Sequence, residues 1–492
     1  MPLRRFLIVV HRWLGVALCL FFALWFPSGI GMMYWDFPSV SPADRLNRSP
    51  ALDPSTVRLS PVEALATLGM PAASEIRLNT FDRRPVYRFR INGADEIVYA
   101  DTGERHREVS NAMAQRIASA WVAQPAPSAT VAILDEADQW TVPPSFGALR
   151  PMFRYGWPNG DQVYVSQGSG EVVQFTTSLS RLEAYLGPIP HWLYFTPLRK
   201  RPALWNAVVT WVSGIGTIAA VLGLAIGVWT WSPFRRYRVN GTAVRWPYRG
   251  AKRWHAILGL IVGVAAATWA FSGMLSMEPF PLRGGGGDES RSTIARALRG
   301  QPAPAAFDRF TPSAALTRLA GTPVKELELI SLAGDSLYIA HVAGGETRVV
   351  TLDGQLRAAF DQLRIGTLVT KALAPSGRAS TQPLERYDRY YLDRRHQRPL
   401  PVLLVTLDDR DQSRYYLDLK TATIVEQYGS RDWISRWLYH GLHSLDFPWL
   451  YDHRPLWDIV VIALMLGGTA LSVTSMVLAW QVLGRTLARI AS

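Results

Sequence analysis

The sequence predicts a membrane protein with four transmembrane helices and two large domains of mixed helix and strand outside the membrane. Four apolar runs are each long enough to cross a bilayer, which takes about 20 residues at a rise of about 1.5 Å per residue. The regions between the first and second runs, and between the third and fourth, are too rich in charged and turn residues to span. A third observation is that the first span is repeated in altered form at the third.

The boundaries follow from where the apolar runs begin and end. We expect spans at residues 1–35, 204–232, 254–277 and 456–483, outer domains at 36–203 and 278–455, a basic loop at 233–253 and a tail at 484–492.

The orientation in the membrane follows from the positions of the cations. The loop "FRRYRVNGTAVRWPYRGAKR" (234–253) carries seven Lys or Arg residues and no acidic residue, and each end of the chain adds two arginines. Short cation-rich segments stay in the cytoplasm, so both termini should be cytoplasmic and both large domains periplasmic. "PLRKRP" (197–202) departs from this pattern, because it places three cations at the outer end of the second span. The net charge of +13 is then mostly a topology signal, and we expect no nucleic-acid partner.

A repeat runs through the chain. "HRWLGVALCLFFALWFPSG" (11–29) and "HAILGLIVGVAAATWAFSG" (255–273) share the histidine, Leu-Gly, a tryptophan and Ser-Gly at the same offsets. "HWLYFTPLRKRPALW" (191–205) likewise answers to "HSLDFPWLYDHRPLW" (443–457). One unit of about 250 residues is therefore predicted twice in tandem, with the copies related by an axis along the membrane normal.

The outer domains alternate apolar and polar residues around Gly and Asp turns, as in "PVYRFRINGADEIVYADTGE" (85–104) and "ELELISLAGDSLYIAHV" (326–342). This pattern predicts antiparallel α+β modules, two in each domain. Each domain also offers a helix start with Ser60 or Thr311 as N-cap and proline next, and Glu63 completes a capping box in the first. "RGGGGDES" (283–290) is expected to be a flexible linker.

These features together resemble the PepSY-associated transmembrane family. The "HRWLG" start, the Ser-Gly near the outer helix end, the "YADTGE"-type modules and "LYHGLH" before the last span carry the resemblance, which covers almost the whole chain. It implies PepSY-like periplasmic modules in a bacterial inner-membrane protein. The family includes iron-uptake proteins and ferric-siderophore reductases with b-type haems. The chain has Ser-Gly where Thr-Gly is expected, and it lacks a flavin or nicotinamide module, so the electron donor is not identified.

The first candidate site is His11 with His255, in the first turns of the odd-numbered spans. Glycines at +4 and +18 from each histidine share its helical face, which would suit a flat macrocycle lying against the backbone. Ionisable residues in spans are costly and usually functional, and the repeat symmetry would place the two histidines opposite each other, like two ligands of one iron. Together with the b-type haems that the family resemblance implies, this leads us to expect that the pair holds one haem b. The alternative is that the glycines serve helix packing and the histidines reach the membrane interface.

The second candidate site lies at the outer ends of the even-numbered spans. His191 and His443 correspond in the two repeats and would hold a second haem. His440 and His443 also stand three apart, a spacing that could hold zinc or copper, with nearby methionines as further soft ligands. Histidines that only hydrogen-bond at the interface are the third possibility.

The expected function is electron transfer from a cytoplasmic or quinol donor, through one or two haems, to a periplasmic ferric chelate such as a ferric siderophore. This would make the chain a transmembrane ferric-chelate oxidoreductase. Membrane lipid is an expected partner, and the sequence identifies no catalytic residue. No hydrolase, zincin or phosphate-loop motif occurs in the sequence. The alternative is a non-catalytic membrane-anchored PepSY protein that binds or restrains a protease or envelope partner. A transporter is disfavoured, because the spans are almost free of acids.

Overall fold

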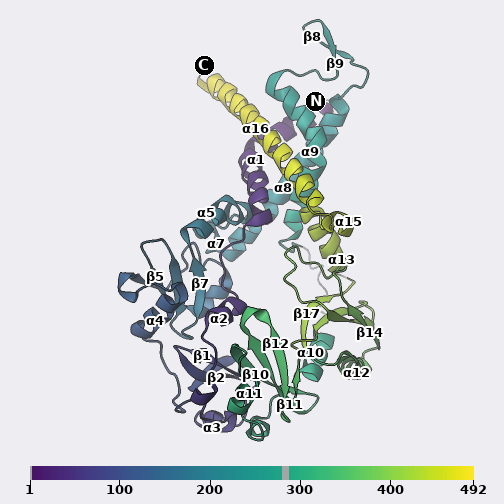
Figure 1. Cartoon of the computed structure of the whole chain (residues 1–492). Coiled ribbons are helices and arrows are strands. Elements are labelled where there is room, and N and C mark those ends of the chain that lie inside the picture. The colour runs from purple at the N-terminus through teal and green to yellow at the C-terminus, as the bar shows by residue number, and fades with distance from the viewer. Residues whose placement is uncertain (1–2, 280–286, 431, 492) are drawn as a thin grey trace.

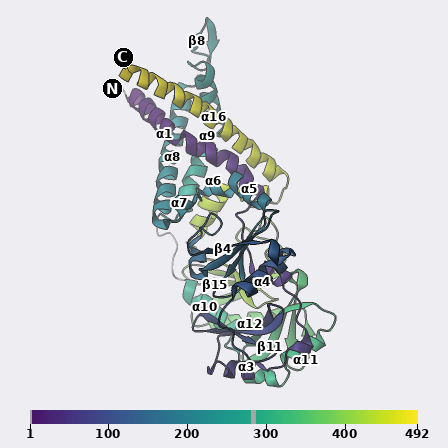
Figure 2. The same ribbon diagram turned by 90° about the vertical axis from the view of Figure 1, so that its left-hand side faces the viewer.

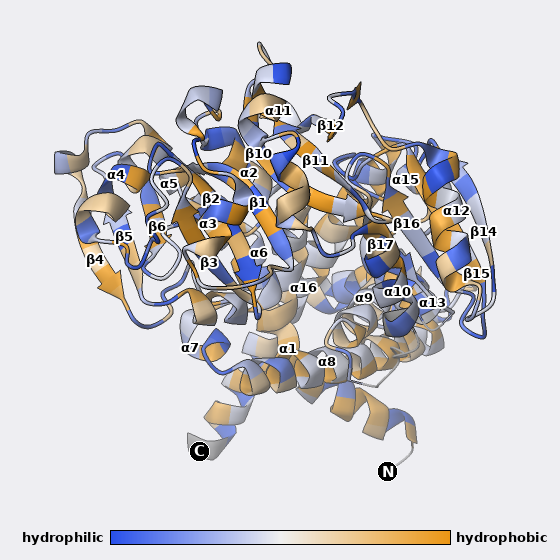
Figure 3. Ribbon diagram, turned by 90° about the horizontal axis from the view of Figure 1, so that it is seen from below, coloured by the Kyte–Doolittle hydropathy of each residue, from blue (hydrophilic) through white to orange (hydrophobic). Residues whose placement is uncertain are grey.

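Four long helices form a bundle at one end of the molecule (Figure 1). The computed structural model describes residues 3–279, 287–430 and 432–491. The bundle consists of α1 (Leu3–Tyr34), α8 (Pro202–Thr230), α9 (Gly250–Leu275) and α16 (Leu456–Ala491). All four are long and apolar enough to cross a membrane, and Figure 3 shows hydrophobic residues along α1 and α8. The predicted four-span architecture is confirmed.

Close contacts between small and large residues hold the bundle together. α8 packs on α9, α9 on α16, and α16 on α1. Gly468 of α16 lies against the ring of Phe26, and a Cβ at Gly263 of α9 would come within 2.8 Å of Leu224 on α8. Small residues allow this approach where lipid supplies no hydrophobic driving force between helices.

Both chain ends and the short hairpin between α8 and α9 lie at the end of the bundle away from the large domains (Figures 1 and 2). The hairpin comprises β8 (Tyr237–Val239) and β9 (Thr242–Val244) and belongs to the basic loop. The three cation-rich segments therefore share one side of the molecule.

The large domains hold the remaining strands. The first contains α2 (Pro42–Arg48), η1 (Pro54–Thr56), α3 (Pro61–Ala66), β1 (Glu75–Phe81), β2 (Arg84–Ile91), β3 (Ala94–Tyr99), α4 (Asn111–Val122), η2 (Ala126–Ser128), β4 (Thr130–Leu134), η3 (Pro144–Leu149), β5 (Met152–Gly156), β6 (Gln162–Ser166) and β7 (Val172–Thr176). The second contains α10 (Gly287–Leu298), η4 (Pro304–Asp308), α11 (Pro312–Arg318), β10 (Val324–Leu332), β11 (Asp335–Val342), η5 (Ala343–Gly345), β12 (Thr347–Thr351), β13 (Leu356–Arg357), α12 (Gln362–Leu373), β14 (Arg378–Leu384), β15 (Val402–Asp408), β16 (Arg414–Asp418) and β17 (Thr423–Tyr428).

Both expected helix caps are present. The Ser60 hydroxyl accepts from the Glu63 backbone N–H while the Glu63 carboxylate accepts from the Ser60 N–H, which completes the capping box of α3. Thr311 caps α11 by accepting from the Ala314 N–H. The expected linker differs: residues 283–286 lie outside the described residues, and residues 287–290 begin helix α10. Burial of Ile294 and Leu298 against the second domain explains why this segment is helical.

The two large domains share one sheet. Strands β13-β12-β11-β10-β1-β2-β3 form seven neighbours in that order, and β4-β5-β6-β7 and β14-β15-β16-β17 form separate four-stranded sheets. The join is the antiparallel pair β1 and β10, with Ile76 opposite Leu329. Near it, the buried Asn79 side chain donates to Glu326 across 2.8 Å. The central sheet therefore belongs to both domains, and one hydrophobic core built from residues of both domains covers one of its faces.

Short helices connect each outer domain to its even-numbered span. In the first half these are α5 (Ser178–Leu186), α6 (Pro188–Trp192) and α7 (Thr196–Arg199); in the second they are α13 (Asp432–Ile434), η6 (Ser435–Gly441), α14 (Leu442–Ser444) and α15 (Pro448–Tyr451). α6 packs on α1, and α14 packs on α9. These contacts bring residues from outside the spans against the outer part of the bundle.

Candidate functional site: two histidine pairs

The first histidine pair lies between α1 and α9. The ring centroids of His11 and His255 are 6.2 Å apart, with the ring planes tilted by 44°. His11 Nδ1 lies 3.0 Å from the carbonyl oxygen of Ala219 on α8. His255 Nδ1 lies 3.2 Å from Thr474 Oγ1 and 3.3 Å from Ser475 Oγ, both on α16. All four spans therefore contribute to this inner pair.

A glycine on α8 makes room for the inner pair. A Cβ built at Gly223 of α8 would come within 2.7 Å of His11 Cε1. Gly15, one turn beyond His11, has no atom within 4 Å of the position its Cβ would take. The glycine that leaves space beside His11 is therefore Gly223 of α8, and Gly15 of α1 does not contact the ring.

The second histidine pair lies outside the spans, on the short connecting helices. The ring centroids of His191 on α6 and His443 on α14 are 6.0 Å apart, with the planes at 69°. His191 Nδ1 lies 3.1 Å from Ser28 Oγ and 3.2 Å from the Trp25 carbonyl oxygen. His443 Nδ1 lies 2.9 Å from Ser272 Oγ.

The repeated Ser-Gly motif serves this outer pair. Ser28 and Ser272 provide the hydroxyls, and the glycines that follow them lie next to the imidazoles. A Cβ at Gly29 would be 3.6 Å from His191 Cε1, and one at Gly273 would be 3.8 Å from His443 Cε1. The sequence predicts that these two glycines share the helical face of His11 and His255. They do share that face, but about 18 residues at about 1.5 Å each carries them to the other end of the helix.

One hydrogen-bonding pattern holds for both pairs. Within the described residues, the hydrogen bonds of all four rings run through Nδ1. A hydrogen bond at one imidazole nitrogen fixes the tautomer and the ring orientation, which leaves the other nitrogen for a metal. Each pair therefore presents two Nε2 atoms to which no described residue forms a hydrogen bond.

The spacing of the rings also suits a metal between them. A bond from a metal to an imidazole nitrogen is about 2 Å long, and the ring centroid lies about 1 Å behind that nitrogen, so two imidazoles on opposite sides of one ion have centroids about 6 Å apart. Ordinary ring contacts in this bundle reach the same value, as for Phe22 and Phe26 at 5.9 Å. The spacing of the rings is thus also compatible with ordinary packing. The hydrogen bonds at Nδ1, which both histidine pairs share, distinguish them from an ordinary ring contact.

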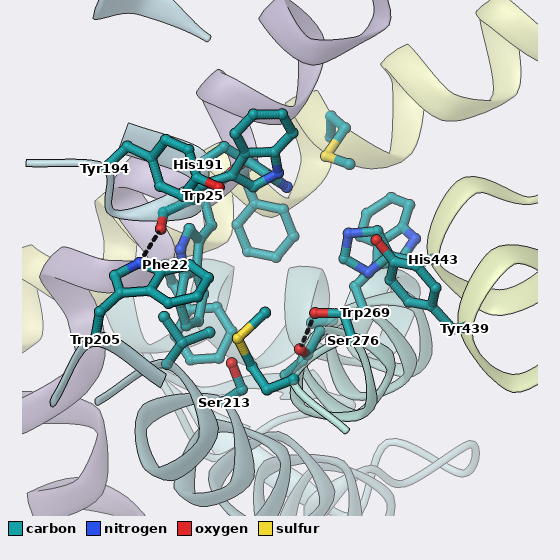
Figure 4. Close-up of a pocket in the computed structure, with 18 residues that line it drawn as sticks. Phe22, Trp25, His191, Tyr194, Trp205, Ser213, Trp269, Ser276, Tyr439 and His443 are labelled. Atoms are coloured by element: carbon teal, nitrogen blue, oxygen red, sulfur yellow. Dashed lines mark hydrogen bonds between the residues drawn. The ribbon is translucent and has the colours of Figure 1, made fainter. Parts of the chain in front are cut away.

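A cavity of about 280 Å³ lies beside the outer pair (Figure 4). Its lining comes from α1, α6, α8, α9, η6, α14 and α16 and consists of Phe22, Trp25, Phe26, His191, Trp192, Tyr194, Trp205, Val209, Ser213, Ala266, Trp269, Ala270, Gly273, Ser276, Met277, Tyr439, His443 and Met465. A concave, aromatic wall with a few polar groups is typical of a small-molecule or cofactor site. Two histidines within aromatic walls fit a flat, largely apolar macrocycle with an iron at its centre.

Burial keeps the outer histidines neutral. It lowers the pKa of His191 to about 4 and that of His443 to about 3. Neutral imidazole is the form that binds a metal. Burial also raises the pKa of Asp446, just after α14, to about 6.

The other sequence candidates are placed differently. Residues 435–441 form a π-helix, so His440 does not share an α-helical face with His443, and its side chain is exposed. No group of three or more His, Cys, Asp or Glu side chains that could hold a metal ion occurs among the described residues. A zinc or copper site at His440 and His443 would therefore lack a third ligand of these types there. Met277 lines the outer cavity.

Several residues of the site were not found from sequence. Thr474, Ser475 and the Ala219 carbonyl give no signal in a single sequence, because apolar spans contain many hydroxyls and every residue has a carbonyl. Ser28 and Ser272 did give one, since both repeats keep the serine, but its role as the histidine partner required the tertiary structure.

A comparison with protein-family models assigns the chain to a family. The model of the PepSY-associated TM region matches residues 8–482, nearly the whole chain. The chain belongs to this family. No curated protein sequence matches it. Membership and the four apolar helices establish a multi-pass membrane protein of the PepSY-associated family.

Proposed function

We propose that the protein is a haem-bearing electron-transfer protein of the bacterial inner membrane, with one haem b at each histidine pair. The observation that carries the proposal is the shared geometry of the two pairs: in both, Nδ1 is held by the protein and the rings stand about 6 Å apart. A bound haem iron supplies reversible one-electron transfer at a potential set by its ligands and surroundings. The chain itself orients the ligands.

The residues around each pair would keep the imidazoles in place. Ser28 and Ser272 hold Nδ1 of the outer histidines, and Ala219 holds that of His11. The four Nε2 atoms are then available as two pairs, and each pair could bind one iron. Because hydrogen bonds to a ligand histidine raise its basicity and fix its orientation, these partners would also tune the potentials.

The two pairs would form a path across the membrane. Trp25 and Ser28, which contact His191, lie 14 and 17 residues beyond His11 on α1, or about 21–26 Å along the helix. Aromatic rings fill part of this interval: Phe22, Phe26 and Trp269 form a chain with centroid separations of 5.9 and 6.1 Å. Electrons would pass from the inner haem to the outer one through this aromatic part of the bundle.

The direction of flow rests on the charge distribution. The basic loop and both chain ends would be cytoplasmic, and the PepSY-like modules of both tandem repeats would be periplasmic. A cytoplasmic or quinol donor would reduce the inner haem, and a periplasmic ferric chelate, of the ferric-siderophore type, would be reduced at the outer one.

The visible spectrum of the protein purified in detergent from haem-replete cells tests this proposal. Two haems with histidine ligands should give a strong Soret band and sharp α and β bands on reduction, with two haems per chain. A colourless preparation would remove the proposal.

The orientation has a separate test. A reporter active only in the periplasm should be active when fused in the exposed turn at Gly334 of the second outer domain. It should be silent at Gly241 in the β8–β9 hairpin, because that loop carries the cations. The opposite pattern would reverse the proposed direction of electron flow.

A second function is favoured by one surface feature of the first outer domain. β4 is an edge strand of its sheet, and Val131 and Ile133 on it are 51% and 59% exposed. Exposed apolar edges can pair with an added strand, which would suit a non-catalytic PepSY protein that binds or restrains a protease or envelope partner. A colourless protein that captures such a partner through β4 would favour this alternative.

A further inference from the structure

Arg199 is a buried cation for which the described residues supply no hydrogen-bond acceptor. It ends α7, and only 7% of its side chain is exposed. Its Nε is sealed from solvent and has no hydrogen-bond partner. Among the described residues, no carboxylate forms an ion pair with it either. It belongs to "PLRKRP" (197–202), the cation-rich segment that departs from the expected charge distribution.

The neighbouring cations show that this state is unusual here. Lys200, the next residue, is more exposed and forms an ion pair with Glu136 at 2.8 Å. Arg436, which is only 2% exposed, donates to the carbonyl oxygens of Arg389 and Asp446, although its Nη1 has no partner among the described residues. A charged group taken out of water without a partner is destabilising, so an anion that the described residues do not supply would stabilise Arg199.

The surroundings of Arg199 connect it to the outer cavity. Its guanidinium carbon lies 4.2 Å from the ring centroid of Trp205 and 4.9 Å from that of Tyr194. Both rings line the cavity beside His191 and His443 (Figure 4). Cation–π contacts of this kind offset part of the burial, and they place the guanidinium next to two residues of the cavity lining, although Arg199 is not itself part of that lining.

The second half does not reproduce this charge. In the alignment of "HWLYFTPLRKRPALW" with "HSLDFPWLYDHRPLW", Arg199 corresponds to Tyr451 and Tyr194 to Asp446. Tyr451 is buried against Trp457. One side of the outer site thus carries a cation that no described carboxylate pairs with, while the other carries a partly buried carboxyl group and a buried phenol.

We propose that Arg199 binds a carboxylate of the group held between His191 and His443, namely a propionate of the outer haem. This rests on the function proposed above. A guanidinium forms paired hydrogen bonds with a carboxylate, and the two propionates are the anionic parts of an otherwise apolar macrocycle. The same oxyanion chemistry could come from a phospholipid phosphate, and the test below separates the two sources.

The test compares haem and haem dimethyl ester, which lacks the carboxylates, in the full chain. Both are loaded into protein carrying His255→Ala, so that only the outer site is filled, with Arg199 intact or changed to Gln. Transfer of haem to apomyoglobin measures its loss. Arg199→Gln should speed the loss of haem about tenfold or more, because hydrogen bonds to charged groups are among the stronger ones. Esterification alone should do the same.

The Arg199→Gln variant loaded with the dimethyl ester tests for a direct contact between Arg199 and the carboxylate. Once Arg199 is Gln, esterification should have little further effect, because two groups in direct contact are not additive. Arg199→Gln should also lower the midpoint potential of the outer haem, since removing a positive charge favours the ferric state. Lys200→Gln, the matched control, should change neither quantity.

Other outcomes would overturn the inference. Independent, additive effects of the variant and the ester would exclude a direct contact. Unchanged haem retention and potential, with loss of co-purifying phospholipid, would assign the site to a lipid phosphate. If Arg199→Gln does not fold, Arg199→Lys replaces it, and an ester effect as large as that with arginine would exclude the paired contact. Unmodified protein that takes up no haem would instead remove the proposed function itself.

Discussion

The inner and outer histidine pairs present the same chemistry in different settings. The inner rings belong to two transmembrane helices, and their Nδ1 partners come from the other two. The outer rings belong to short helices outside the spans, and their Nδ1 partners, Ser28 and Ser272, come from α1 and α9. The roles of the helices are therefore exchanged between the pairs: α1 and α9 carry the histidines of one and the hydroxyls of the other.

This difference shows what each pair depends on. The inner pair requires only the packing of the four-helix bundle. The outer pair also requires α6 and α14 to dock against α1 and α9, so it links the spans to the outer domains. A change at the outer pair can therefore be transmitted to the outer domains, whereas a change at the inner pair acts within the bundle.

The largest expected effect comes from the histidines themselves. His255→Ala should remove the inner haem and His443→Ala the outer one, so that each variant retains about half the haem. His11→Ala combined with His255→Ala should cost little more than either alone, because ligands of one metal act as a unit. Haem content and reduced spectra measure this. Full haem loading in the two inner variants would show that the repeated histidine serves packing.

A second variant should disturb the inner pair without changing a histidine. Gly223→Ala places a methyl group 2.7 Å from His11 Cε1, and overpacking of this kind costs about 1–3 kcal/mol. The midpoint temperature of thermal unfolding should fall, and the inner haem should be lost in preference to the outer haem. Gly484→Ala on α16 is the control, because no atom lies within 4 Å of that Cβ. Equal loss of both haems would contradict the separate settings of the pairs.

A third variant acts on the outer pair through its partner. Ser272→Ala removes the hydroxyl 2.9 Å from His443 Nδ1, and the loss of such a partner typically costs about 10- to 100-fold in metal affinity. Ser276→Ala is a close control, since Ser276 also lines the cavity but donates to the Gly273 carbonyl oxygen. Haem titration of the outer site should separate the two variants. Equal behaviour would mean that the hydroxyl does not act on the histidine.

The smallest effect concerns the outer domains and pH. Burial would raise the pKa of Glu328, but the hydrogen bond with His341 and the charge of Arg299 outweigh it and lower that pKa from 4.5 to about 2. The depressed pKa stabilises the fold above pH 4.5, and this stability is lost as the pH falls from 4.5 to 2. Between pH 7 and pH 4 the loss should be about 1 kcal/mol.

Thermal unfolding at several pH values measures this dependence. Glu328→Gln should lower stability at pH 7 and flatten the profile below pH 4.5. At pH 7 it should leave the inner haem unchanged, because Glu328 lies on β10, within the outer sheet. An unchanged profile would mean that the ion cluster does not titrate with folding.

The sequence by itself determined the four spans, the helix caps at Ser60 and Thr311, and the side of the molecule on which the cations gather. These features depend on local composition and on periods short enough to be recognised in one chain. It also indicated that His11 corresponds to His255, and His191 to His443.

Only the tertiary structure decided what lies around those histidines. The Ala219 carbonyl, Thr474 and Gly223 come from helices far away in the chain, and no local pattern marks which residue of an apolar span faces a ring. The same holds for the pairing of β1 with β10 and for the burial of Arg199 against Tyr194 and Trp205. They depend on how the two halves pack against each other, and the free energy of that packing is spread over contacts that no short stretch of sequence contains.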